Sequence, residues 1–268
     1  MQHEAITGLA REQVDEVVAR VTRYLGTAEI TRNGGRPCAL GLYDSVVLVI
    51  HLIRRNPVQA VAAEFFAVSQ STVSRRWDLL RPIIATVLTD LIPHPRAIIR
   101  GGTALVDGTL CPTWDWKEPG GLFSRKAGYP GMNVQIACDL RGELAAIGPA
   151  PIPGARHDAY TYAASGLKDL LGGTHVLADL GYVGVDGIDI VPIKRRPGQE
   201  LHEKAKANNR VLSSIRAAVE RAVAHVKTWR MLSEEGGHFR PPIEKFPEML
   251  AAAWGLINLK RHMIVAYE

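Results

Sequence analysis

The sequence predicts a small all-α domain followed by an α/β domain in which helices flank a mixed sheet. Apolar residues recur at helical spacing through the first hundred residues, and short strand-like runs replace them after residue 100. The 268 residues are 47% hydrophobic and 22% charged, which suits an ordinary globular protein with a sizeable core. No apolar run reaches the length of a membrane span, and the amino terminus resembles no signal peptide. We therefore expect a cytoplasmic protein that makes no membrane contact.

Helical periodicity marks four segments before residue 100. They cover residues 14–25, 42–53, 57–66 and 70–80. Pro93, Pro95 and Gly102 then interrupt the pattern, as they would at a domain boundary. We expect domains at 1–98 and 99–268.

Strand-like runs follow at residues 104–106, 133–138, 143–147, 175–178 and 188–193. A helical segment at 158–171 separates the third run from the fourth, and a long helix covers about 207–229. This order of elements predicts the mixed sheet with flanking helices.

The segment from about 57 to 80 has the pattern of a helix-turn-helix. Ser69 is a natural N-cap for its second helix, which would bury Val73 and Trp77. Ala67 falls in the turn, where a positive φ would cost about 1 kcal/mol. Five polar residues are predicted to face outward and to contact DNA: Gln70, Ser71, Ser74, Arg75 and Arg76. The alternative is a plain helical pair with a polar outer face.

Charge is distributed unevenly along the chain. Residues 194–230 carry 10 Lys and Arg against 3 Asp and Glu, whereas residues 101–193 carry 6 against 10. An acidic stretch beside a basic one suits an enzyme that holds cations close to phosphates, although a solvated helical face would also explain the basic part.

Two aspartates occupy equivalent places at the ends of predicted strands. Asp107 follows the apolar run ALV and precedes Gly108, and Asp179 follows HVLA. Carboxylates on adjacent strands could share divalent ions such as Mg²⁺, which prefer oxygen ligands. Two such ions would activate a nucleophile and stabilise the leaving oxygen in phosphodiester cleavage. Either aspartate alone could instead be a turn or capping residue.

Glu220 belongs to a polar stripe on the long helix. With Arg216 set at zero on a helical wheel, Lys227 falls near about 20° and Glu220 near about 40°. The apolar face lies beside this stripe, which would place Glu220 at the edge of the core. The alternative for Glu220 is an exposed acid supported by Arg216 one turn earlier.

Several sequence blocks resemble, in order, those of bacterial insertion-sequence transposases of the DDE superfamily. These are VDGTLCPTWDW, SRKAGYPGMNVQIACD, GARHDA, ADLGYVG and RAAVERAVAHVKTWRML, and the resemblance covers most of residues 50–235. Asp107, Asp179 and Glu220 match the three acids of the family. Two positions depart from its pattern, because Ser213 replaces a Tyr and Leu180 replaces a basic residue.

The resemblance implies a ribonuclease H-like fold and an endonuclease that binds Mg²⁺ or Mn²⁺ through Asp107, Asp179 and Glu220. It also implies double-stranded DNA as the partner, both the ends of the element and its target, with a homodimer or higher oligomer assembled on the DNA. We expect Lys126, Arg216 and Lys227 to contact DNA phosphates.

Other functions and roles stay open. A DNA-binding protein derived from an inactive transposase would keep the helix-turn-helix without nuclease activity, and a glycosidase would use the acids but not the basic stretch. His157 and Asp158 could be further polar groups of the site, but at the start of a helix we expect Asp158 to be a capping residue. Trp114 and Trp116 could stack on a displaced base, but packing in the core or against a strand is expected for both.

Overall fold

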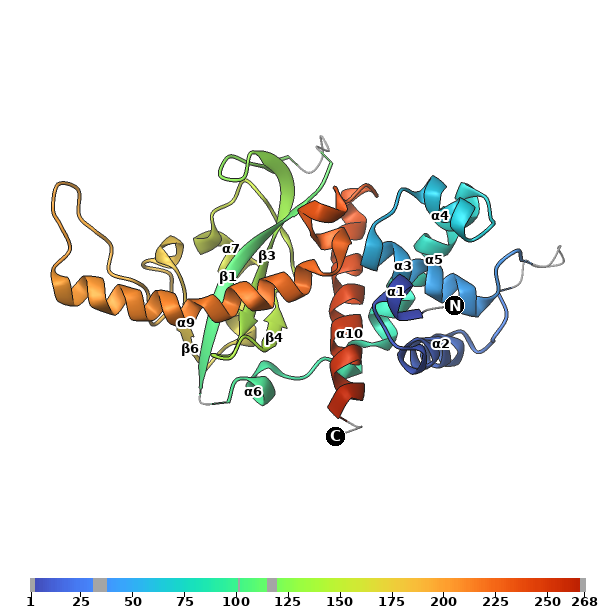
Figure 1. Cartoon of the computed structure of the whole chain (residues 1–268), viewed down its shortest axis with the longest axis horizontal. Helices are drawn as coiled ribbons and strands as arrows, with labels where there is room; N and C mark the ends of the chain where they lie inside the picture. Colours follow the sequence, from blue (N-terminus) through green and yellow to red (C-terminus); the bar gives the residue numbers. More distant parts are fainter. Residues whose placement is uncertain (1–2, 31–37, 101, 115–119, 266–268) are drawn as a thin grey trace. The chain divides into compact units, whose positions relative to one another are not determined.

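The computed structural model describes residues 3–30, 38–100, 102–114 and 120–265. Its contacts divide the chain into two compact units (Figure 1). The first, here called the helical unit, consists of residues 1–92 together with 228–268, and the second, the sheet unit, of residues 93–227. The expected boundary at residue 98 is close to the junction at Pro93. Residues 228–268, however, which we expected beside the sheet, belong to the helical unit.

The helical unit is assembled from both ends of the chain. Its elements are α1 (His3–Thr7), α2 (Arg11–Leu25), α3 (Leu42–Arg55), α4 (Gln59–Phe65), α5 (Gln70–Val87), η1 (Thr89–Leu91), η3 (Arg230–Leu232), η4 (Glu234–Gly236), η5 (Ile243–Lys245) and α10 (Phe246–Val265). Helix α10 packs along α5, and Gly255 lets it approach closely, since a Cβ there would lie 2.6 Å from the Cβ of Leu88. Helix α10 has no clear signal in the sequence, because its apolar residues lie on most sides and give little amphipathic contrast.

The predicted helix-turn-helix corresponds to α4 and α5. Ala67 in the turn has a φ of 51°, the positive value that its position predicted. Ser69 caps α5 and accepts a hydrogen bond from the Thr72 amide. Helix α5 continues to Val87 past Pro82, farther than periodicity indicated. Val73 and Trp77 are buried as expected.

The sheet unit contains six strands and four α-helices among its described residues. These are α6 (Pro95–Ile98), β1 (Thr103–Pro112), β2 (Phe123–Ser124), β3 (Tyr129–Cys138), β4 (Leu144–Ile147), β5 (Ile152–Pro153), α7 (Asp158–Ala164), α8 (Leu167–Leu170), β6 (His175–Leu177), the short η2 (Leu180–Tyr182) and α9 (Glu203–Lys227). Strand β1 pairs antiparallel with β3 and parallel with β6, so the sheet is mixed, as predicted. Its order is β2-β3-β1-β6, with β4 and β5 also paired to β3.

Two expected elements of the sheet unit differ from the structure. The run at 188–193 contributes only an isolated parallel bridge between Leu177 and Ile190. Pro192 follows and has no amide hydrogen for a ladder to use, which explains why no strand continues there. The helix expected at 158–171 is divided into α7 and α8 at Gly166, whose φ is 77°.

Helices cover both faces of the sheet. Successive residues of a strand point to opposite faces of the sheet, so what lies next to Asp107 and next to Gly108 shows what covers each face of β1. The Asp107 carboxylate meets Arg216 of α9, whereas a Cβ on Gly108 would meet Asp158 of α7. Helix α9 therefore covers one face of β1 and β3, where Figure 1 shows it crossing the strands, and α7 covers the other.

No helix in the described part of the chain is both long and apolar enough to span a membrane.

Candidate functional site

Asp107 and Asp179 lie on adjacent strands and are held in the same way. Asp107 lies within β1, and Asp179 follows β6, which runs parallel to β1 beside it. The amide of Gly108 donates to Asp107 Oδ1 at 2.8 Å, and the amide of Gly181 donates to Asp179 Oδ1 at 2.7 Å. One oxygen of each carboxylate is thus fixed by backbone, and the other is left for a further partner.

The second oxygen of each aspartate faces the same positive group. Arg216 Nη2 lies 3.4 Å from Asp107 Oδ2 and 3.9 Å from Asp179 Oδ2. These separations are ion-pair distances that are longer than a good hydrogen bond. The three side chains are only 20% to 30% exposed, so their charges are weakly screened by solvent. The structure therefore brings together two of the predicted acids and one of the predicted phosphate-binding residues.

Burial changes the acidity of Asp107. Desolvation of its charged form raises the pKa of Asp107 from 3.8 to about 6. The positive charge of Arg216 and the Gly108 amide act in the opposite direction, while the negative charges of Asp179 and Asp158 add to the rise. A buried carboxylate that is costly to ionise is a place where additional positive charge is favoured.

A further acid, Asp158 at the start of α7, lies near Asp179 and does not cap the helix as we expected. The N-cap of α7 is His157, which is exposed, and the Asp158 carboxylate points to the strands instead of capping. Its Oδ1 accepts a hydrogen bond from Asn133 Nδ2 at 2.8 Å. A Cβ on Gly181 would lie 2.9 Å from Asp179 Oδ1 and 3.8 Å from Asp158 Oδ2, so both carboxylates lie close to this glycine.

A chain of buried hydrogen bonds holds Asp158 in this orientation. Gln135 Nε2 donates to Asn133 Oδ1 and to Thr161 Oγ1, and the Tyr182 hydroxyl donates to Gln135 Oε1 at 2.8 Å. Gln135 is fully buried, and burial raises the pKa of Tyr182 well above its ordinary value, so the phenol stays a donor. The sequence does carry a sign of this network, because Asn133 and Gln135 are two amide side chains within an otherwise apolar strand.

Of the remaining predicted residues of the sheet unit, only Lys126 has a described contact with one of these acids. Glu220 is exposed on α9, one turn beyond Arg216. Burial raises the pKa of the Cys111 thiol near the end of β1, and Lys227, at the end of α9, lowers it through its charge. Lys126 Nζ is 3.9 Å from Asp158 Oδ2, and its side chain is 88% exposed. Trp114 is 56% exposed, so the packing expected for it was wrong, and Trp116 lies outside the described residues.

Four of the five residues predicted to contact DNA through the helix-turn-helix are accessible. Gln70, Ser71 and Arg75 are exposed, and Ser74 is half-buried. The outward orientation predicted for Arg76 was wrong, because its side chain is buried and its Nη2 donates to the Leu40 carbonyl at 3.3 Å. Arg76 follows Val73 by three positions and therefore shares its buried face.

The chemistry of the donors fits a divalent cation shared between Asp107 and Asp179. Their Oδ2 atoms converge on one cationic group, and carboxylate oxygens are the ligands that Mg²⁺ prefers. Among the described residues, no three His, Cys, Asp or Glu side chains are close enough together to hold an ion as they stand. Two protein carboxylates suffice for Mg²⁺ when substrate phosphates and water complete its shell.

Gly108 gives a direct test of how tightly the site is packed. A Cβ there would lie 2.5 Å from Asp158 Oδ1 and 2.6 Å from Gln135 Nε2, so we expect Gly108→Ala to lower the free energy of unfolding by about 1 to 3 kcal/mol. Chemical denaturation measures the change. Gly120→Ala is the control, because its Cβ would meet nothing within 4 Å. Equal losses in the two variants would contradict the close packing at Gly108.

Comparison with known proteins identifies the family of this chain. Residues 106–258 match the family described as DDE superfamily endonuclease. The chain therefore belongs to the DDE superfamily of endonucleases, and its helical region followed by a mixed sheet with flanking helices agrees with the ribonuclease H-like fold.

One relative is similar over most of its length. The chain is 32% identical over 230 residues to a protein of Streptomyces albus G described as "Putative transposase for insertion sequence element IS112". The similarity covers 85% of this chain and 84% of the relative. No solved structure shows a significant match.

Proposed function

We propose that this protein is a DNA transposase that cleaves the ends of an insertion sequence and joins the freed 3′ hydroxyl to target DNA. The observation that carries the proposal is the convergence of Asp107 Oδ2 and Asp179 Oδ2 on one cationic position. Membership of the DDE superfamily and the similarity to the IS112 relative support the same activity.

In this proposal Asp107 and Asp179 hold Mg²⁺ or Mn²⁺, and Glu220 completes the site. The ions supply charge stabilisation and nucleophile activation when bound. The Gly108 and Gly181 amides keep each aspartate turned so that its second oxygen faces the site. Arg216 balances the two carboxylates in the absence of DNA and has the fork of donors that a phosphodiester takes up. Lys126 and Lys227 would contact phosphates farther along the strand.

We propose that the helix-turn-helix recognises the ends of the element. Gln70, Ser71, Ser74 and Arg75 carry amide, hydroxyl and guanidinium groups suited to base edges and phosphates. Two ends must be brought together for transposition, so we expect a dimer or higher oligomer on DNA.

The proposal is tested by incubating the protein with duplex DNA that contains the sequences flanking its gene. We expect nicking or strand transfer with Mg²⁺ or Mn²⁺, no reaction in EDTA, and loss of the reaction in Asp179→Asn, whose side-chain oxygen can still accept from the Gly181 amide. Metal-independent DNA binding without any cleavage would instead indicate a DNA-binding protein derived from an inactive transposase. Cleavage by Asp179→Asn at the wild-type rate would exclude this aspartate from catalysis.

A further inference from the structure

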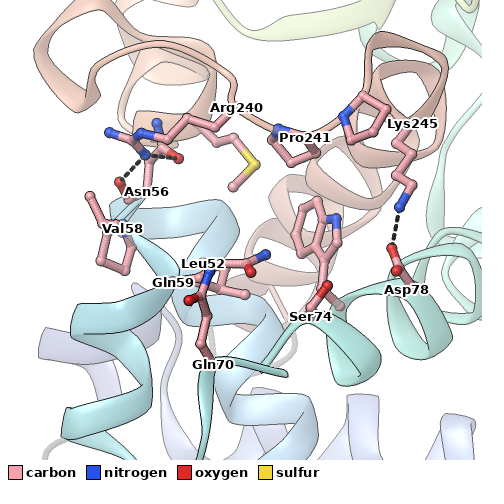
Figure 2. A pocket seen from close by; sticks show the side chains of 14 residues that line it. Leu52, Asn56, Val58, Gln59, Gln70, Ser74, Asp78, Arg240, Pro241 and Lys245 are labelled. Carbon is pink, nitrogen blue, oxygen red and sulfur yellow. Dashed lines mark hydrogen bonds and ion pairs between the residues drawn. The ribbon is translucent and has the colours of Figure 1, made fainter. Parts of the chain in front are cut away.

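A pocket of about 310 Å³ lies in the helical unit beside the helix-turn-helix (Figure 2). One wall is formed by the end of α3, the start of α4 and the first turns of α5, including Gln59, Gln70 and Ser74. The opposite wall comes from the segment after α9, through Arg240, Pro241 and Lys245. Residues that are far apart in the sequence thus meet next to the helix predicted to contact DNA.

Arg240 contributes to this pocket a positive charge that no acid among the described residues neutralises. Its Nη1 donates to the carbonyl and the side-chain Oδ1 of Asn56, at 3.1 and 3.2 Å. No described Asp or Glu forms an ion pair with Arg240. Two neutral acceptors therefore orient the guanidinium, while Nε and Nη2 make no hydrogen bond with other described residues.

Asn56 fixes the position of Arg240 in the pocket wall. It is 4% exposed, and its Nδ2 donates to the carbonyls of Gly236 and His238 at 2.9 and 3.3 Å. Asn56 thus binds both the backbone of the segment and the side chain that the segment carries. Such anchoring reduces the entropy that Arg240 would lose on meeting a ligand.

Lys245, on the same wall, is in a different electrostatic state. Its Nζ lies 2.6 Å from Asp78 Oδ1, so its charge is already paired (Figure 2). Arg240 is therefore the cation of this pocket that is available to an anion.

We infer that the pocket binds a phosphodiester of the DNA backbone through Arg240, next to the bases contacted by α5. Its volume, equal to about ten water molecules, admits a hydrated phosphate. Gln70 opens α5, where the partial positive charge of the helix favours an anion, and its amide and the Ser74 hydroxyl are further donors. The inference rests on the proposed DNA binding, and it assigns part of that binding to a segment outside the helix-turn-helix.

Binding of labelled duplexes of random sequence, measured by fluorescence anisotropy over a range of salt concentrations, tests this site. A phosphate contact is independent of sequence, so Arg240→Gln should weaken binding about ten-fold on every duplex and reduce the salt slope by about 1. Arg240→Lys should restore most of the slope, because it keeps the charge. The double variant Lys245→Gln with Asp78→Asn keeps the net charge, and Arg81, which also contacts Asp78, keeps its closer partner Glu248, so the slope should be unchanged.

The outcomes separate this inference from the proposed function. A wild-type slope in Arg240→Gln would overturn the inference, as would equal slopes in Arg240→Gln and Arg240→Lys, which would indicate a structural role alone. If Arg75→Gln weakens binding in those circumstances, the helix-turn-helix proposal stands without the Arg240 site. A wild-type protein that binds no DNA would overturn both.

Discussion

Replacing Asp107 with asparagine is expected to slow cleavage strongly and, in the same protein, to stabilise the fold at pH 7. Loss of one carboxylate ligand should slow metal-dependent cleavage by about a thousand-fold, the rate equivalent of several kcal/mol. The side chain is mostly buried and its pKa is raised to about 6, so ionisation of Asp107 at neutral pH opposes folding. Removing that charge should raise the free energy of unfolding by about 3 kcal/mol.

The sign of the pH dependence follows from the direction of the shift. The folded protein holds the Asp107 proton more tightly than the unfolded chain, so folding is favoured while the carboxyl is protonated. That contribution is complete below pH 3.8 and is lost as the pH rises to about 6. Asp107→Asn should therefore match the wild type below about pH 4 and exceed it above about pH 6.

Denaturant unfolding in EDTA, measured across this pH range, checks the prediction without interference from bound metal. Asp169→Asn is the comparison, since Asp169 is exposed on α8. The prediction fails if the free energies of unfolding of the wild type and Asp107→Asn differ by the same amount from pH 4 to pH 7. That result would show that burial does not raise the pKa of Asp107.

Glu220→Gln should produce the same loss of cleavage with no gain in stability. Glu220 is exposed on α9, and surface substitutions usually change the free energy of unfolding by less than about 0.5 kcal/mol. If Glu220 is the third acid, as the resemblance to DDE transposases implies, cleavage should fall by about a thousand-fold while the melting temperature is unchanged.

Glu203→Gln is the matched control for this experiment, because it makes the same chemical change in the first turn of the same helix. It should cleave as the wild type does. If Glu220→Gln also cleaves at the wild-type rate, the third acid is another residue. Asp158, held beside Gly181 by Asn133, would then be the one to replace with Asn.

Much of the fold, and the places of Asp107 and Asp179 at neighbouring strands, could be predicted because their signals are local. Asp107 and Asp179 each follow an apolar run and are closely followed by glycine, and both features are visible in a short stretch of sequence. The positive φ of Ala67 could likewise be expected from its place in a turn between two helices. In each case neighbouring residues determine the backbone.

What the sequence did not reveal depends on contacts between distant segments. The start of a helix normally explains an acid, and only the position of Asn133 on β3 shows why Asp158 turns toward the strands. Arginine is usually exposed, yet Arg76 is buried, and its guanidinium donates to the carbonyl of Leu40. Helix α10 has little amphipathic contrast, and its place beside α5 becomes apparent only in three dimensions.

The discontinuous helical unit imposes an order on folding during synthesis. Helix α5 cannot bury its contact surface against α10 until the ribosome has made every residue of the sheet unit and most of the remaining chain. Domains form as units during translation, so the sheet unit can complete its contacts first. A messenger truncated within the sheet unit would yield a helix-turn-helix without its packing partner. Such fragments should be degraded and should not compete with the full-length protein for DNA.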